Sequence, residues 1–104
     1  NVAPANGIYG TSKSALSTYM KYAALELAGK GIRCNAVQPG RINTPLISNR
    51  LLSEEDVTKD IEQYPMKRYG KPEEVAHAII YLLSDASAWV TGTNLVIDGG
   101  RSLK

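Results

Sequence analysis

Apolar residues recur at helical spacing between positions 9 and 28, and no proline interrupts them. Intervals of three and four residues place side chains on one face of an α-helix. The apolar stripe consists of Leu16, Tyr19, Met20, Ala23 and Leu27. Gly29 and Gly31 follow it and suit a left-handed helix stop. The pattern therefore predicts a long first helix from about Tyr9 to Ala28.

Two short apolar runs predict strands. The first, Ile32 to Val37, ends at Pro39-Gly40, because proline cannot continue a ladder and glycine tolerates a sharp turn. The second, Leu95-Val96-Ile97, is uninterrupted and lies between polar turn segments. A short apolar run without alternation is typical of a strand that is buried on both faces.

Polar residues dominate positions 41–65, where we expect a long connection that contains a short helix. Ser53 is suited to be its N-cap, because the acidic residues 54–56 follow directly and favour a first helical turn. Connections of this length tend to be lids or binding loops. Another helix is predicted from Pro72 to about Ser84, since proline is favoured at the first helical position. Its expected buried stripe is Val75, Ile79, Leu82 and Leu83.

The order of helix, strand, loop, helix and strand is typical of a parallel α/β sheet. Two strands alone do not make a stable parallel sheet, because both of its faces and its edges need covering. The pattern therefore predicts the tail of a larger α/β domain. The chain begins with Asn1 rather than methionine, so we expect a fragment or a processed product.

Composition narrows the class of protein. With 104 residues, 43% hydrophobic and 21% charged, the chain suits part of one globular domain. A net charge of +2 from scattered basic residues argues against a nucleic-acid partner, and no apolar stretch is long enough to span a membrane. Cys34 is the only cysteine and is expected to be a buried thiol, which fits a reducing cytoplasm. One cysteine and one histidine, His77, cannot build a zinc site, and His77 is expected to be a solvated surface residue.

Tyr9 and Lys13 are the first candidates for chemistry. Their four-residue spacing places a phenol and an ammonium on the same helical face. A phenol has a free pKa of about 10, and a nearby cation favours its ionised form and brings proton transfer within reach. Spacing alone also fits an ordinary tyrosine that packs on a lysine stem.

Further segments of the sequence favour the catalytic interpretation of this pair over simple packing. After Tyr9-Gly-Thr-Ser-Lys13 come Asn-Ala-Val-Gln-Pro-Gly-Arg-Ile-Asn-Thr at 35–44, Arg-Tyr-Gly-Lys-Pro-Glu-Glu-Val-Ala at 68–76 and Val-Thr-Gly-Thr-Asn-Leu-Val-Ile-Asp-Gly-Gly at 90–100. In this order and at these spacings, the four segments resemble the C-terminal portion of the short-chain dehydrogenase/reductase family. The resemblance covers essentially the whole chain.

The resemblance implies an α/β fold, the C-terminal part of a Rossmann-type doubly wound parallel sheet with flanking helices. Residues 1–104 would be the C-terminal part of a single NAD(P)-binding domain whose N-terminal cofactor half is absent from this chain. The implied activity is hydride transfer between the nicotinamide of NAD or NADP and a small-molecule alcohol/carbonyl substrate. Tyr9 would be the general acid/base, and Lys13 would bind the nicotinamide ribose while lowering the pKa of the tyrosine.

The resemblance also assigns cofactor contacts after the first strand. Pro39 and Gly40 would let the backbone pass close to the nicotinamide, with no room for a bulky side chain. Ile42 and Thr44 match positions that meet the cofactor carboxamide, and residues 45–65 match a mobile substrate-binding segment. The family's glycine-rich turn, catalytic serine and relay asparagine belong upstream of this sequence. We therefore expect the 104 residues alone to be inactive.

Alternatives remain open at this stage. A catalytically inactive fragment or pseudo-enzyme could act through subunit association, using the broad apolar face of the first helix, which includes Ala15 and Tyr22. The chain ends could instead mark only the ordered part of a longer enzyme. A homodimer or homotetramer is expected in the family, and Trp89 is expected to pack or to line a subunit contact.

Overall fold

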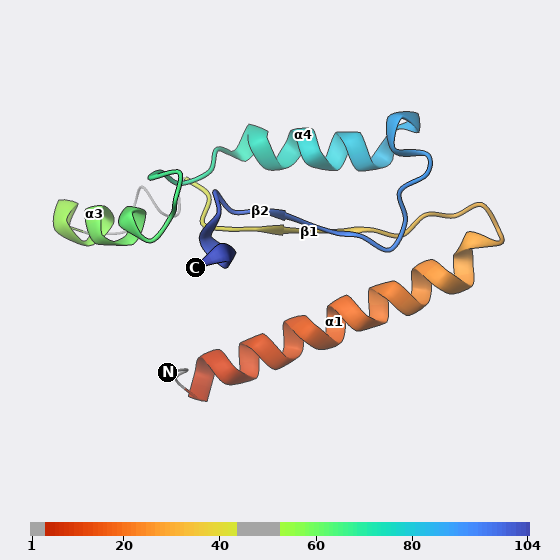
Figure 1. The fold of residues 1–104 in the computed structure, drawn as a ribbon, viewed down its shortest axis with the longest axis horizontal. Coiled ribbons are helices and arrows are strands. Elements are labelled where there is room, and N and C mark those ends of the chain that lie inside the picture. The colour runs from red at the N-terminus through yellow and green to blue at the C-terminus, as the bar shows by residue number, and fades with distance from the viewer. Residues whose placement is uncertain (1–3, 44–52) are drawn as a thin grey trace. The chain divides into compact units, whose positions relative to one another are not determined.

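The computed structural model describes residues 4–43 and 53–104. Its elements divide between two compact units, one comprising residues 4–36 and 88–94 and the other residues 37–43, 53–87 and 95–104. In chain order, the elements are α1 (Pro4–Ala28), β1 (Ala36–Pro39), α3 (Glu54–Glu62), α4 (Pro72–Leu83), the 3₁₀ turn η1 (Asp85–Ser87), β2 (Asn94–Ile97) and the 3₁₀ turn η2 (Arg101–Leu103) (Figure 1).

Helix α1 ends at Ala28 as predicted, but it begins at Pro4, five residues before Tyr9. Proline is tolerated at a helix start because its fixed φ is already helical and its missing N–H has no partner there. At the other end, Gly31 has a φ of 74°, and its N–H donates to the carbonyl of Ala28 at 3.0 Å. The predicted left-handed stop is therefore confirmed.

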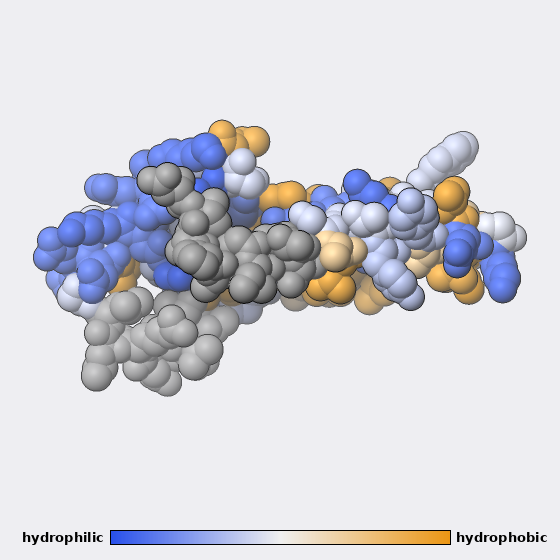
Figure 2. Space-filling model, turned by 90° about the horizontal axis from the view of Figure 1, so that it is seen from below, coloured by the Kyte–Doolittle hydropathy of each residue, from blue (hydrophilic) through white to orange (hydrophobic). Residues whose placement is uncertain are grey.

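The predicted apolar stripe of α1 is only partly correct. Met20 is buried, together with Ala24, which the prediction did not include. Leu16 and Tyr19 are exposed, and so are Tyr22 and Leu25. Hydrophobic residues reach the surface as orange patches among polar ones (Figure 2). Within the described residues, α1 thus has one covered face and one uncovered apolar face.

Strand β1 begins four residues later than the predicted start at Ile32 and includes Pro39. The amide of Asn35 explains the delay, because it replaces backbone pairing with side-chain pairing. Its Nδ2 donates to the carbonyl of Val90 at 2.9 Å, and its Oδ1 accepts from the N–H of Thr93 at 3.0 Å. The regular ladder starts only at Ala36, whose N–H donates to the carbonyl of Thr93 at 2.9 Å.

Strands β1 and β2 form a two-stranded sheet, and their arrows point the same way (Figure 1). The parallel register continues to Gly40, whose N–H donates to the carbonyl of Ile97 at 2.9 Å. The α/β class with parallel strands is therefore confirmed. The prediction that β2 is buried on both faces is wrong for the described residues, because Val96 is 43% exposed.

Helices α3 and α4 begin where local signals predicted. The Ser53 Oγ accepts from the N–H of Asp56 at 3.1 Å, and Pro72 is the first residue of α4. The expected buried stripe of α4 is wrong for the described residues, since Val75 and Leu82 are only half-buried, Ile79 is exposed and Leu83 is 79% exposed.

Three single residues were also assigned an environment. His77 is exposed, as expected. Cys34 is a free thiol and is half-buried rather than buried, because it lies in the irregular segment before β1. Trp89 is 97% exposed, so the expected packing is absent within the described chain.

The carboxylate of Glu74 fixes the start of α4. It accepts from Arg68 in a bidentate pair at 2.7 and 2.8 Å and from the N–H of Lys71 at 2.8 Å. The hydrogen bonds from Arg68, followed by the one from Lys71, lower the pKa of Glu74 to about 2. The charged form of Glu74 is therefore the form that the fold stabilises.

We expect Asn35→Ala to lower the free energy of unfolding by about 1–3 kcal/mol, because the Thr93 N–H loses a partly buried partner, while the Val90 carbonyl retains its bond from Arg33. Urea unfolding of both proteins measures the difference. Lys30→Ala is the matched control, since Lys30 is an exposed neighbour outside these bonds. A loss for Asn35→Ala no larger than for the control would contradict a structural role for this amide.

We expect the stabilisation from Glu74 to depend on pH. The folded-state pKa lies near 2 and the ordinary value is 4.5, so the unfolded state takes up the proton first as the pH falls. The stability difference between the wild type and Glu74→Gln should be complete above pH 4.5 and should shrink toward pH 2. Urea midpoints across this range measure it, and a pH-independent difference would refute the ion-pair account.

Candidate active site

Tyr9 and Lys13 both lie on α1, four residues apart within one continuous helix. This confirms the predicted helical backbone at both positions. Lys13 is half-buried. The side chain of Tyr9 lies outside the described part of the structure, so its role stays a prediction.

Gly40 follows the last residue of β1, Pro39, at a crowded point of the second unit. A Cβ added at Gly40 would lie 3.0 Å from the Cβ of Asp98 and 3.2 Å from Cε1 of Tyr64. The family resemblance implies that glycine is needed here because a cofactor passes close to the backbone. Asp98 and Tyr64 already leave no room for a side chain, and the cofactor contact stays a prediction.

Ile42 lies two residues after Gly40 and forms a parallel bridge with Gly70. The Arg41 carbonyl accepts from the N–H of Gly70 at 3.0 Å, and the Gly70 carbonyl accepts from the N–H of Asn43 at 2.8 Å. The backbone at Ile42 is thus held by a second segment of the same unit. Thr44, the other predicted carboxamide contact, lies outside the described residues.

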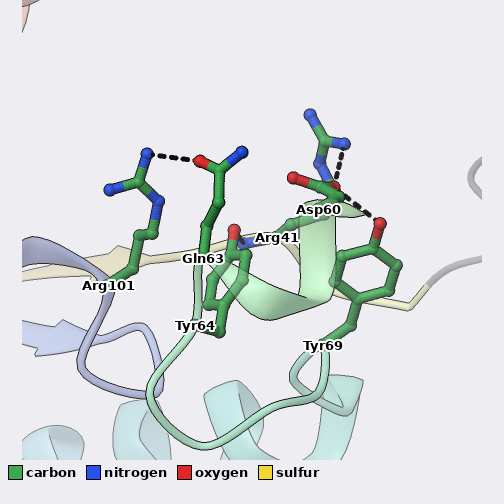
Figure 3. A network of polar contacts seen from close by, with 6 residues as sticks. All are labelled: Arg41, Asp60, Gln63, Tyr64, Tyr69 and Arg101. Atoms are coloured by element: carbon green, nitrogen blue, oxygen red, sulfur yellow. Dashed lines mark hydrogen bonds and ion pairs between the residues drawn. The ribbon is translucent and has the colours of Figure 1, made fainter. Parts of the chain in front are cut away.

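A polar network that the sequence did not predict lies beside these positions (Figure 3). Oδ2 of Asp60 accepts from the Arg41 guanidinium and from the Tyr69 hydroxyl, each at 2.6 Å. The Tyr64 hydroxyl accepts from the N–H of Arg41 at 3.1 Å. No local pattern in the sequence indicates that Asp60 and Tyr64 share Arg41 as a partner, because Arg41 lies 19 and 23 positions earlier.

The protonation states in this region follow from the same contacts. Burial, and then the hydrogen bond to Asp60, raise the pKa of the Tyr69 phenol, so Tyr69 remains a donor to the carboxylate. Burial acts to raise the pKa of Asp98, but hydrogen bonds from Ser102, Gly100 and Arg101 outweigh it and lower the pKa. Asp98 is therefore an ionised cap for the turn that follows β2.

A pocket of about 240 Å³ opens at the carboxyl ends of β1 and β2 within the second unit. Ligands of open α/β sheets bind outside the carboxyl ends of the strands. Met66 and Val96 supply apolar lining, and the charged lining residues are Arg41, Arg68, Glu74 and Asp98. Two arginines and two carboxylates give this lining no net formal charge.

The structure thus brings the predicted residues together in two sets. Tyr9 and Lys13 share α1 in the first unit, whereas Pro39, Gly40 and Ile42 share the strand end in the second. Within residues 4–43 and 53–104, no group of three or more His, Cys, Asp or Glu side chains is arranged to hold a metal ion. The helices described there are all too short or too polar to cross a membrane.

Comparisons with known proteins bear on this site. A family model described as enoyl-(acyl carrier protein) reductase matches residues 1–102. Glucose 1-dehydrogenase 2 from Bacillus subtilis is 45% identical over 101 residues, which cover 96% of this chain and 38% of that protein. A 3-oxoacyl-[acyl-carrier-protein] reductase from Thermotoga maritima is 44% identical over 108 residues, covering 96% and 43%. The chain therefore spans less than half the length of these relatives.

Solved structures agree with the sequence relatives. A 4-hydroxyisoleucine dehydrogenase mutant complexed with NADH and succinate matches 99% of this chain and 42% of that one, with 31% identity and a TM-score of 0.87. The aldohexose dehydrogenase of Thermoplasma acidophilum, in ligand-free form, matches 99% and 44%, with 37% identity and a TM-score of 0.84. The shared fold is of the Rossmann type, and the chain belongs to the short-chain dehydrogenase/reductase family.

Proposed function

We propose that the protein is an NAD(P)-dependent oxidoreductase that transfers hydride between the nicotinamide and a small-molecule alcohol/carbonyl substrate. Residues 1–104 would form the C-terminal part of its single Rossmann domain. The observation that carries the proposal is the placement of Tyr9 and Lys13 one turn apart on α1, inside a family match over residues 1–102. The relatives' names include dehydrogenases and reductases of sugars, alcohols and acyl groups, which supports a small alcohol/carbonyl pair as the substrate class.

Tyr9 and Lys13 would divide the work at the reacting end of the substrate. The Tyr9 hydroxyl would give its proton to the carbonyl oxygen in reduction and take it back in oxidation. The Lys13 ammonium supplies three donors and no acceptor, which fits ribose hydroxyl oxygens, and its charge favours the phenolate of Tyr9. Bound NAD or NADP would supply the hydride.

The strand end in the second unit would hold the nicotinamide. We assign cofactor contacts to Pro39, Gly40, Ile42 and Thr44. The crowding at Gly40 and the bridge at Ile42 give this segment a fixed backbone, which suits recognition through main-chain groups. The distinction between NAD and NADP depends on residues outside this chain, so the proposal covers both cofactors.

We also propose that the enzyme is a cytoplasmic homodimer or homotetramer. The oligomer is supported by the broad apolar face of α1 that the described residues leave uncovered, where four large side chains each expose between 66% and 76% of their surface. These are Leu16, Tyr19, Tyr22 and Leu25. The same face supports the second candidate, an inactive protein that acts through subunit association. Turnover in the full-length protein separates the two, since only the enzyme requires Tyr9 for a chemical step.

We expect Tyr9→Phe in the full-length protein to reduce kcat by at least about 10³-fold, because the substrate oxygen loses its proton donor. Nicotinamide cofactor affinity, measured by fluorescence titration, should stay within about twofold of the wild type, since phenylalanine keeps the ring.

Tyr81→Phe is the matched control, because Tyr81 is an exposed tyrosine on α4 with no assigned role in the site or in the subunit contact. It should retain wild-type turnover. Retained turnover in Tyr9→Phe would remove Tyr9 from the acid/base role, and a wild-type protein without any cofactor binding would favour the inactive candidate.

A further inference from the structure

Asp60 is the meeting point of three elements of the second unit. Its Oδ2 atom accepts hydrogen bonds from Arg41 after β1 and from Tyr69 before α4, both at 2.6 Å, while Asp60 itself lies on α3 (Figure 3). A carboxylate that accepts two short hydrogen bonds on one oxygen holds both donors in fixed directions. Asp60 therefore ties α3 to the chain on either side of it.

The burial of this carboxylate distinguishes it from the other acidic group of α3 that forms an ion pair. The Asp60 side chain is 26% exposed, whereas Glu55, which pairs with Lys59 at 3.4 Å, is 77% exposed. Exposed pairs on a helix contribute little, because solvent screens them and both side chains must be ordered. The Asp60 contacts lie closer to the protein interior and constrain backbone segments rather than one helix surface.

Arg41 links Asp60 to the end of β1. Its guanidinium binds Asp60, its N–H donates to the Tyr64 hydroxyl at 3.1 Å and its carbonyl accepts from Gly70 at 3.0 Å. All three of these hydrogen bonds join Arg41 to residues of the segment 60–70. Since Arg41 stands between Gly40 and Ile42, the network fixes the backbone at the two positions that flank it.

The Tyr64 ring adds a steric wall to the same segment. Its Cε1 lies 3.2 Å from the place of a Cβ on Gly40, and its ring meets Tyr69 edge to face with 6.1 Å between centroids. Tyr64 is buried. Tyr64 therefore contacts the strand end twice. Its hydroxyl accepts from the Arg41 N–H, and its ring occupies the space beside Gly40.

We propose that Asp60 and Tyr64 are positioning residues that set the geometry of residues 40–42 for the nicotinamide cofactor. The inference rests on the proposed function, because it uses the cofactor contacts assigned there to Gly40 and Ile42. Neither side chain needs to touch the cofactor. Their effect passes through Arg41, so it falls on cofactor affinity rather than on proton transfer at Tyr9.

The test compares Asp60→Asn and Tyr64→Phe in the full-length protein with the wild type. Asp60→Asn keeps the size of the side chain but removes the charge that holds Arg41, and Tyr64→Phe removes only the acceptor for the Arg41 N–H. Each variant should raise the Kd for NADH or NADPH by about 5- to 20-fold, because a small displacement of a binding segment is costly. The kcat at saturating cofactor should stay within about threefold.

The double variant should weaken cofactor binding by less than the product of the two single effects, because both residues act through Arg41. Glu55→Gln, which removes an exposed carboxylate from the same helix, is the matched control and should leave the Kd unchanged. Thermal unfolding of every variant identifies a simple loss of folding, which would lower kcat, substrate affinity and cofactor affinity together.

Unchanged cofactor affinity in both Asp60→Asn and Tyr64→Phe would overturn the inference, and so would equal losses in substrate and cofactor affinity. If Asp60→Asn does not fold, Tyr64→Phe decides the matter alone. The proposed function fails by a different result, namely turnover that survives Tyr9→Phe. The two failures are therefore distinguishable.

Discussion

The hydrogen bond from the Gly40 N–H to the Ile97 carbonyl, 2.9 Å long, is the contact on which the second unit depends. It closes the parallel register of β1 and β2 between residues far apart in the sequence. It also brings Asp98 against Gly40, where the two backbones approach too closely for any side chain at position 40. The predicted cofactor segment with Pro39, Gly40 and Ile42 lies at this contact, and the pocket at the strand ends lies next to it.

From that contact, the remaining order of the unit is built by side chains. The turn after β2 is capped by Asp98, which accepts from the N–H groups of Gly100 and Ser102 at 3.0 and 2.9 Å. Arg101 in this turn donates to Gln63 at 2.8 Å, so the chain after β2 also holds the end of α3 (Figure 3). These hydrogen bonds therefore join the strand ends and α3 into one network. A binding segment that is held by such a network keeps a fixed geometry.

Features encoded by a few adjacent residues could be predicted from the sequence. The Ser53 cap, the start of α4 at Pro72 and the stop at Gly31 each follow from local backbone chemistry. The late start of β1 could not be predicted, because the Asn35 amide pairs with residues 55 and 58 positions away. Hydrophobic periodicity gave the helices but not which faces are covered, since that depends on partners elsewhere, as the exposure of Leu83 shows.

The residues of the candidate site also fall into those that could be predicted from the sequence and those that could not. The Tyr9–Lys13 spacing is local, and the family resemblance was carried by ordered segments, so both were visible in the sequence. The network of Asp60, Tyr64 and Tyr69 around Arg41 was not, because a carboxylate in a helix gives no sign of an arginine 19 positions earlier. Such positioning contacts are long-range and specific to the folded chain.

In the proposed function, Lys13 lets Tyr9 exchange a proton with the substrate near neutral pH. The most direct test is the pH profile of kcat/KM for alcohol oxidation by the full-length wild type and by Lys13→Met, which removes the charge but keeps the stem. We expect the midpoint of the profile to move upward by about one pH unit or more toward the ordinary phenol pKa of about 10. An unchanged midpoint in a variant that still turns over would contradict the account.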